Sequence, residues 1–221
     1  ERIQYIWQRV AEDFAPFDVD VTTEMPSSDR LTRSGSGDDI YGTTVLITKR
    51  TFYDCSCGGV AYLGVFDNTS DYYKPALVFY DMLGSGNEKY VAEAASHEAG
   101  HNVGLHHDGT STQGYYTGHG TGATGWAPIM GVGYYQPLVQ WSKGEYATAN
   151  NVQDDYVVMA ANGLPVRLDD HGDTIATTSA LPGATLGGVT SFSGGGVIER
   201  PGDIDMFGFT KDDFVDSVMD I

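Results

Sequence analysis

The stretch SHEAGHNVGLHHDG, residues 96–109, constrains this chain more than any other part of it. His97 and His101 are four residues apart, so in a helix both imidazoles lie on one face and can reach a single metal ion. Gly104 is suited to end that helix in a left-handed conformation, and His107 follows as a third donor. Three protein ligands leave the fourth position of a tetrahedral zinc site open to water, which is typical of a catalytic site.

Glu98 directly follows the first histidine, where its carboxylate can take a proton from a zinc-activated water. The alternative, a solvated His-rich turn, is disfavoured because the pattern HExxHxxGxxH is far rarer by chance than HExxH alone. We expect the remaining histidines near the motif to be bystanders. His106 is out of register with the ligands, and His119 has no visible partner in its loop.

The residues HEAGHNVGLHHD resemble the extended zinc signature of the metzincin metalloendopeptidases, and the Asp after the third His is similar to that of the reprolysin (adamalysin-like) branch. The resemblance implies one catalytic Zn²⁺ with Glu98 as general base. It implies three zinc ligands, namely His97, His101 and His107.

The same resemblance implies roles for three residues around the site. Gly104 is the turn glycine, and Asp108 makes a structural hydrogen bond without binding zinc. In WAPIMGVGYY, Met130 matches the Met-turn residue beneath the zinc, with plain core packing as the alternative. Some metzincins carry a zinc-binding tyrosine two residues after that Met. Here the position is Val132, so we expect no such ligand.

Periodicity and turn residues predict an α/β (α+β) fold. The resemblance makes it a metzincin catalytic domain with a mixed, mostly parallel twisted sheet, a zinc helix and a Met-turn, followed by a partial β-rich tail. The expected elements are a helix stopped by Pro16, strands at 17–24, 41–50, 59–67 and 75–83, a helix from Asn87 to Gly104, and a helix from Ser142 to near Gly163.

GGVAYLGVF is similar to the family's edge strand, which borders the cleft. An exposed strand edge offers unpaired N–H and C=O groups to any extended peptide, so we expect protein or peptide substrates to bind along it. The tyrosines after the Met-turn are expected to line the specificity pocket, with aromatic packing as the alternative. The expected substrate-binding residues are Gly59, Val60, Ala61, Tyr62, Leu63, Tyr134 and Tyr135.

After Pro165 the composition shifts to β-formers and turn residues. We therefore expect a catalytic domain at 1–165, lacking its first strand, and a partial β-rich C-terminal domain at 174–221. The tail GGVIERPGDIDMFGFT resembles the bacterial pre-peptidase C-terminal domain. Asp203 and Asp205 in it are expected to alternate out of a strand, with a structural Ca²⁺ site as the alternative.

The acidic composition makes some classes of binding partner unfavourable. Thirty acidic residues against twelve basic ones give a formal charge of -18, which disfavours nucleic acid and anionic membrane surfaces. No apolar run is long enough to span a bilayer, so we expect no membrane insertion, and we expect a monomer. The chain opens on Glu1 without a signal peptide, so we interpret it as a mature or excised piece.

Cys55 and Cys57 are the only cysteines. A C-x-C pair is a poor zinc site and a strained place for a disulfide, so a structural or unpaired role is preferred, with pairing to a segment outside this chain left open. The many disulfides of animal reprolysins are missing, which favours a secreted bacterial member.

These observations predict a secreted zinc endopeptidase that hydrolyses peptide bonds through a zinc-activated water. The alternative is a catalytically silent metzincin-fold module for peptide binding or adhesion, and a second rival is a zinc hydrolase acting on something other than protein. An intact base and third ligand argue against a decayed site. Residues 110–140 are expected to form the pocket wall, but the sequence does not determine the cleavage preference.

Overall fold

The computed structural model describes residues 1–209, which form two compact units. One unit comprises residues 1–14 and 18–165, and the other comprises residues 15–17 and the chain from Val166 onward. The helices of the first unit are α1 (Arg2–Asp13), α2 (Glu88–Asn102) and α3 (Asp155–Ala161). Its strands are β1 (Val45–Thr48), β2 (Gly59–Val60), β3 (Ala76–Phe79), β4 (Trp126–Pro128) and β5 (Leu138–Gln140).

The main sheet has the strand order β1–β3–β2. β1 runs parallel to β3, with Val45 opposite Ala76, whereas β2 runs antiparallel to β3, with Val60 opposite Leu77. β2 is therefore an edge strand, and a separate parallel pair joins β4 to β5. The mixed α+β fold expected from the sequence is confirmed.

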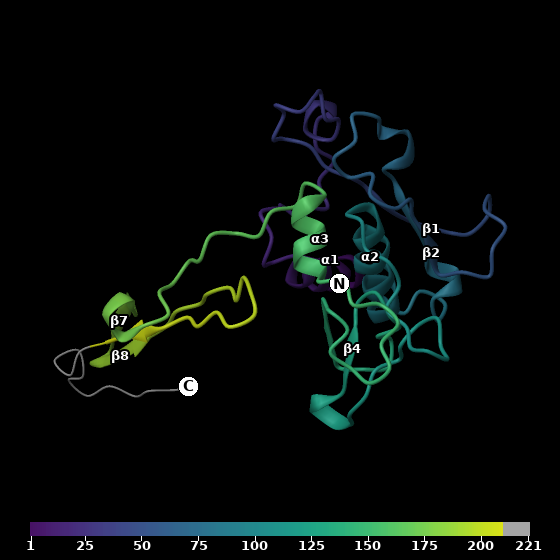
Figure 1. The fold of residues 1–221 in the computed structure, drawn as a ribbon. Coiled ribbons are helices and arrows are strands. Elements are labelled where there is room, and N and C mark those ends of the chain that lie inside the picture. The colour runs from purple at the N-terminus through teal and green to yellow at the C-terminus, as the bar shows by residue number, and fades with distance from the viewer. Residues whose placement is uncertain (210–221) are drawn as a thin grey trace. The chain divides into compact units, whose positions relative to one another are not determined.

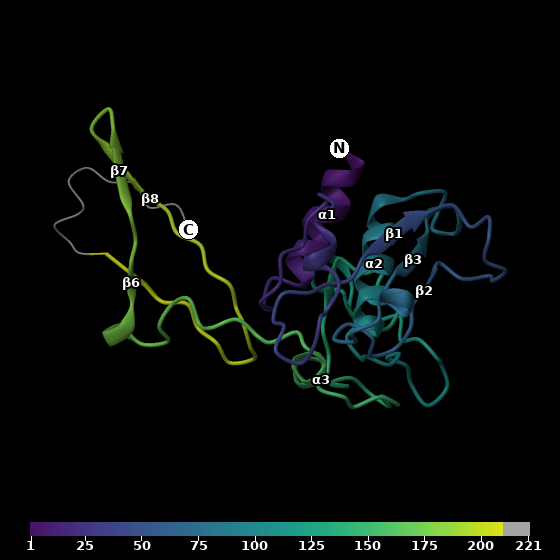
Figure 2. The same ribbon diagram turned by 90° about the horizontal axis from the view of Figure 1, so that it is seen from above.

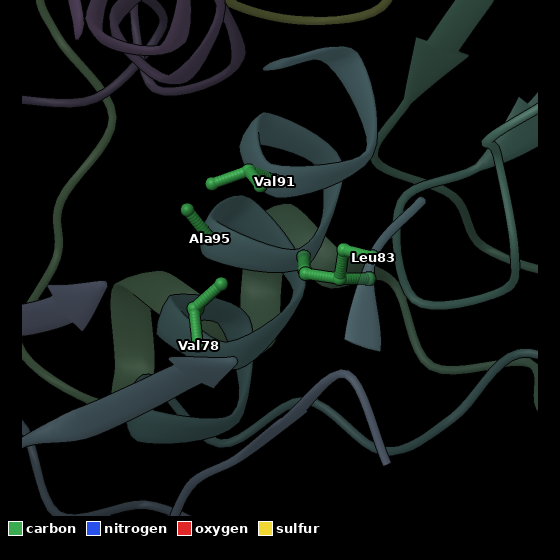
Figure 3. Close-up of a cluster of buried hydrophobic side chains, with 5 residues drawn as sticks. Val78, Leu83, Val91 and Ala95 are labelled. Carbon is green, nitrogen blue, oxygen red and sulfur yellow. The ribbon is translucent and has the colours of Figure 1, made fainter. Parts of the chain in front are cut away.

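Helix α2 packs between α1 and the main sheet, and both ribbon views show it beside the strands (Figure 1, Figure 2). Its N-cap is Asn87, whose side chain accepts hydrogen bonds from the backbone N–H groups of Lys89 and Tyr90. Small residues on α2 let its backbone approach the sheet closely. The core beneath it comprises Val78, Leu83, Val91, Ala94 and Ala95 (Figure 3). Full burial of each larger side chain contributes about 1.5–3 kcal/mol.

Buried polar contacts join α1 to α2. Arg9 Nη2 lies 2.6 Å from Glu93 Oε1, and Glu93 is only 5% exposed. Ser96 Oγ donates to Asp13 Oδ2 at 2.5 Å, directly before the first histidine of the motif. Because an unpaired buried charge is costly, these pairs specify how the two helices dock.

Two expected elements are much shorter than the sequence suggests. The strand expected at 59–67 ends at Val60, because Gly64 has φ +62° and its N–H donates to His101 O instead of to a strand. The helix expected from Ser142 is confined to Asp155–Ala161, because Gly144 and Thr148 have positive φ values that an α-helix excludes.

The strand expected at 17–24 does not form. Phe17 makes an isolated antiparallel bridge to Val166, and no other residue from 18 to 24 pairs in a sheet. Alternation of apolar residues was a misleading signal here. The short β-branched run makes no ladder with a neighbouring strand, and a strand without one leaves its backbone groups unpaired.

The second unit contains β6 (Ser179–Ala180), β7 (Gly183–Leu186), β8 (Val189–Phe192) and β9 (Phe207–Gly208). β6 pairs with β9 in parallel, and β7 forms a hairpin with β8 through Gly187 and Gly188, which both have positive φ. Asp203 and Asp205 lie in irregular chain ahead of β9, so the expected strand alternation is wrong for them. Residues 210–221 of the expected C-terminal domain lie outside the described residues.

Two smaller findings concern the cysteines and the length of the helices. Cys55 and Cys57 are joined in a disulfide, although a C-x-C spacing is a strained place for one. Among residues 1–209, no helix combines the length and the apolar character needed to cross a bilayer.

Candidate active site

Three imidazoles converge at the C-terminal half of α2. His97 and His101 belong to the helix and His107 to the loop after it, and one ligand nitrogen from each lies within 4.8 Å of the other two. The Nε2 atoms of His101 and His107 are 2.9 Å apart. Two nitrogen lone pairs this close repel each other unless a proton or a cation lies between them. This donor set fits a metal ion, and all-imidazole sites suit zinc.

Backbone carbonyls orient two of these imidazoles. His97 Nδ1 lies 2.9 Å from Ile129 O, and His101 Nδ1 lies 2.7 Å from Leu105 O. A carbonyl oxygen can only accept, so each Nδ1 carries the proton. Each Nε2 therefore keeps its lone pair for the point at which the rings meet, which is the usual outer-shell support of a metal-binding histidine.

Burial favours the neutral form of all three rings. Desolvation, reinforced by His101 and His107, lowers the pKa of His97 to about 3. Desolvation and the neighbouring histidines lower the pKa of His107 to about 4, and desolvation also lowers the pKa of His101. The neutral imidazole is the form that binds a metal ion.

Glu98 lies between the histidines and the edge strand. It is 7% exposed, and a Cβ placed on Gly59 of β2 would come within 2.6 Å of both its Cγ and its Oε1. Burial raises the pKa of Glu98 to about 8. A carboxylate in so dry a position is a stronger base than one in water.

Gly104 turns the chain from α2 toward His107. Its φ is +97°, and a Cβ there would lie 2.6 Å from Asn162 Nδ2. The residue must therefore be glycine for two reasons, its left-handed backbone and the close approach of Asn162 after α3. The helix itself ends at Asn102 with Val103 as its C-cap, two residues before the expected glycine.

Met130 packs directly beneath the histidines. It is fully buried, and its Sδ lies so close to α2 that a Cβ on Gly100 would meet it at 2.6 Å. Its carbonyl accepts from the N–H of Asp108 at 2.8 Å, while the carbonyl of the preceding Ile129 holds His97. The turn that contains Met130 therefore contacts both the helix that carries His97 and the loop that carries His107.

The family model described as metallo-peptidase family M12, of reprolysin type, matches residues 20–142, which is more than half of the chain and includes the three histidines. The chain belongs to metallo-peptidase family M12. This membership makes it a zinc peptidase in general terms, with protein as its substrate class. No curated protein matches the chain significantly.

In this M12 peptidase, Asp108 is buried and lies outside the group of three histidines. Burial raises the pKa of its carboxyl group to about 6, and a hydrogen bond with Asn151 opposes that rise. Its backbone N–H and C=O bond to Met130 and Tyr116. Asp108 thereby joins the third histidine to two neighbouring loops.

The expected substrate-binding residues fall into two groups. Gly59 and Val60 form β2, while residues 61–63 leave the sheet along the C-terminal end of α2, where Asn102 Nδ2 donates to Tyr62 O at 3.0 Å. Tyr134 packs against the core, and burial together with the charge of Glu98 raises its pKa to about 12. Tyr135 is 75% exposed.

A surface depression of about 610 Å³ lies beside these two tyrosines. Lys89 forms part of its wall, and Lys89 Nζ donates to the carbonyls of Gly133 and Tyr134 at 2.9 and 3.1 Å. The other lining residues are Gly120, Thr121, Gly122, Tyr134, Tyr135, Gln136 and Pro137. All but Lys89 lie within the loop 110–140.

Sequence reasoning missed Tyr115. Its ring lies 4.4 Å from that of His107, and its hydroxyl is 3.4 Å from His107 Nε2. The residue lies in a Gly- and Tyr-rich loop with no periodicity, so spacing could not single it out. His119 also has a partner that the sequence concealed, because Tyr116 Oη lies 3.0 Å from its Nδ1.

Proposed function

We propose that this M12 peptidase is a secreted zinc endopeptidase, with His97, His101 and His107 holding one catalytic Zn²⁺ and Glu98 acting as general base. One observation carries the proposal. Three neutral imidazoles, two of them oriented by backbone carbonyls, meet beside a buried carboxylate that packs against an edge strand. Base, metal ligands and a peptide-binding edge are thereby brought together in one place.

Zinc, when bound, supplies Lewis acidity that polarises a carbonyl and makes water a better nucleophile near neutral pH. Glu98 takes the proton from the attacking water and delivers it to the amine leaving group. Its packing against Gly59 limits the carboxylate to few rotamers, so the proton acceptor is held in place. The Tyr115 hydroxyl, beside His107, is placed to donate to negative charge that develops on the substrate carbonyl.

The substrate lies extended along β2 in this proposal. β3 pairs with one side of β2, and no strand within residues 1–209 pairs with the other. A peptide that adds there is recognised through its backbone, which suits cleavage within a chain. The depression beside Tyr134 and Tyr135 accommodates one substrate side chain and sets the preference.

We also propose an extracellular bacterial setting and a monomeric enzyme. The Cys55–Cys57 disulfide supports an oxidising compartment, and it is the only disulfide that the sequence permits. We further propose two domains, at 1–165 and 174–221, the second of the pre-peptidase C-terminal type. This division is supported by the change in composition and by the resemblance of the tail.

The test is hydrolysis of a mixed quenched-fluorescent peptide library by the wild type and by Glu98→Ala at equal zinc content. Glu88→Ala is the matched control, because Glu88 lies on the same helix but in its exposed first turn. We expect activity in the wild type and the control, and a loss of at least a hundredfold in Glu98→Ala.

Cleavage by Glu98→Ala at the wild-type rate would refute the role of the base. Silence of the folded, zinc-loaded wild type would refute the endopeptidase and favour the peptide-binding module. Binding of the same library, measured by fluorescence anisotropy, would then separate that module from a hydrolase acting on a different substrate class.

A further inference from the structure

A second group of metal-ligating side chains lies in the unit that starts at Val166, and it is independent of the proposed peptidase site. Oxygens of Asp169, Asp170 and Glu199 lie within 4.8 Å of one another. Oxygens of Asp169, Asp173 and Asp203 do the same. Asp169 belongs to both trios, so five carboxylates converge from two stretches of chain, 169–173 and 199–203.

The burial of Glu199 distinguishes this cluster from an ordinary group of solvated acidic residues. It is 1% exposed, and its Oε2 is buried without a hydrogen-bond partner among the described residues. That oxygen belongs to a carboxyl group aimed at Asp169 and Asp170. Buried charged groups are normally paired or bound to a metal, because an isolated buried carboxylate is strongly destabilising.

Residues 1–209 place little positive charge beside these carboxylates. Within the described part of the chain, the only ion pair made by the five carboxylates is that of Asp170 with His171, at 3.8 Å. His171 itself is engaged by Ser179 Oγ at 2.7 Å and Gly195 O at 3.0 Å. A hydrogen bond from the Glu199 N–H and, more weakly, the charge of Arg200 lower the pKa of Asp203, but Arg200 makes no ion pair with the cluster among the described residues. Like charges this close repel, so a bound cation would stabilise the arrangement.

Backbone groups already hold several of these carboxylates in place. Asp170 Oδ2 accepts from Val197 N at 3.2 Å, and Asp203 Oδ2 accepts from Glu199 N at 2.8 Å. Each of these two carboxylates has a second oxygen that is not used in the bond. The loops therefore orient the ligands before an ion arrives, which reduces the entropy lost on binding.

We propose that this cluster is a Ca²⁺ site that joins residues 169–173 to residues 199–203. All its donors are carboxylate oxygens on irregular loops, which suits a hard cation. Calcium accepts six to eight oxygens in flexible geometry, whereas magnesium requires a near-ideal octahedron. Bound calcium offsets part of the negative charge of the cluster, and it adds a link between two stretches of chain that hydrogen bonds such as Val197 N–H to Asp170 Oδ2 already bring together.

The experiment titrates the zinc-loaded chain of 221 residues with CaCl₂ by isothermal calorimetry after calcium is removed. Glu199→Gln keeps the size of the buried side chain and removes its charge, and Asp169→Asn alters the exposed residue shared by both trios. Asp39→Asn is the charge-matched control in an exposed loop. We expect saturable binding by the wild type, at least tenfold weaker binding by both variants, and a change below twofold in the control.

Absence of saturable calcium binding by the wild type would overturn the proposal, and so would wild-type affinity in both variants. Equal affinity for MgCl₂ would overturn the assignment to calcium. Limited proteolysis gives a readout that does not depend on the variants. Cleavage between 166 and 209 should slow at least fivefold when calcium is added to the wild type, and an unchanged rate would contradict the link between the two segments.

Discussion

Gly59 of the edge strand β2 and Glu98 of α2 pack so closely that a Cβ on the glycine would lie 2.6 Å from the Glu98 Oε1 atom. The same Cβ would lie 2.8 Å from the backbone oxygen of Leu77, so a shift of the added Cβ toward β3 would not relieve the clash. The strand that is proposed to bind the substrate thus also positions the proposed base.

Gly59→Ala should therefore displace Glu98 and lower kcat by about tenfold or more, equivalent to about 1.4 kcal/mol of barrier. Zinc content should stay at the wild-type level, because no histidine is touched. The measurement is steady-state peptide hydrolysis together with metal analysis. Gly35→Ala serves as control, since a Cβ there meets nothing within 4 Å. An unchanged kcat would show that Glu98 need not occupy this position.

Gly104→Ala should destabilise the fold by about 1–3 kcal/mol, because alanine at φ +97° is strained and its Cβ meets Asn162. Zinc affinity should fall as well, since the turn delivers His107. Urea unfolding and zinc titration measure both effects. In the double variant with Asn162→Ala the contact is gone but the backbone strain remains, so only part of the loss should be recovered. Complete recovery would argue against the strain.

Met130→Ala should cost about 2–5 kcal/mol of unfolding free energy, because it leaves a cavity against α2. Met130→Leu conserves volume and should cost less than about 1.5 kcal/mol. Thermal unfolding compares the two. If the leucine variant nevertheless lost zinc affinity, then sulfur, and not packing alone, would matter beneath the histidines.

Tyr115→Phe removes the hydroxyl that lies 3.4 Å from His107 Nε2 and retains the ring contact. We expect kcat to fall about a hundredfold to a thousandfold with little change in KM, as for the loss of one donor to a developing oxyanion. Tyr80→Phe, on an exposed residue away from the histidines, is the control. Equal losses in kcat and zinc content would instead assign Tyr115 to metal retention.

We expect Asp155 to make the stability of the first unit depend on pH. Burial first, then Asp108, Asp154 and Glu145, raise its pKa to about 8, and a bond from Ser142 N–H opposes the rise. The folded state keeps the proton that the unfolded state loses near pH 4. The stabilising contribution of this group is therefore complete below about pH 4, decreases as the pH rises, and is lost above pH 8.

Asp155→Asn retains an acceptor for the Ser142 N–H and cannot ionise. The difference in unfolding free energy between the variant and the wild type should therefore grow in favour of the variant by about 1–3 kcal/mol when the pH is raised from 5 to 8.5. Urea unfolding at the two pH values measures this difference. Parallel pH profiles for the two proteins would show that Asp155 is already ionised in the folded state.

The sequence predicted helix α2 and the candidate site on it, because both depend on interactions between residues that are close in the chain. The spacing of His97 and His101, the cap at Asn87 and the glycine after the helix act within one or two turns, so each can be read from neighbouring letters. Membership of the M12 family agrees with that reading. The roles of the individual site residues remain predictions for the experiments above.

The tertiary structure decided what depends on distant partners. Strand 59–67 is cut to two residues because its N–H groups bond the end of α2, and the helix expected from Ser142 is cut short by two residues of positive φ. The approach of Tyr115 to His107, and the gathering of Asp169 and Glu199, join residues whose separation carries no period. Periodicity reports only which face a residue occupies, whereas packing determines which faces meet.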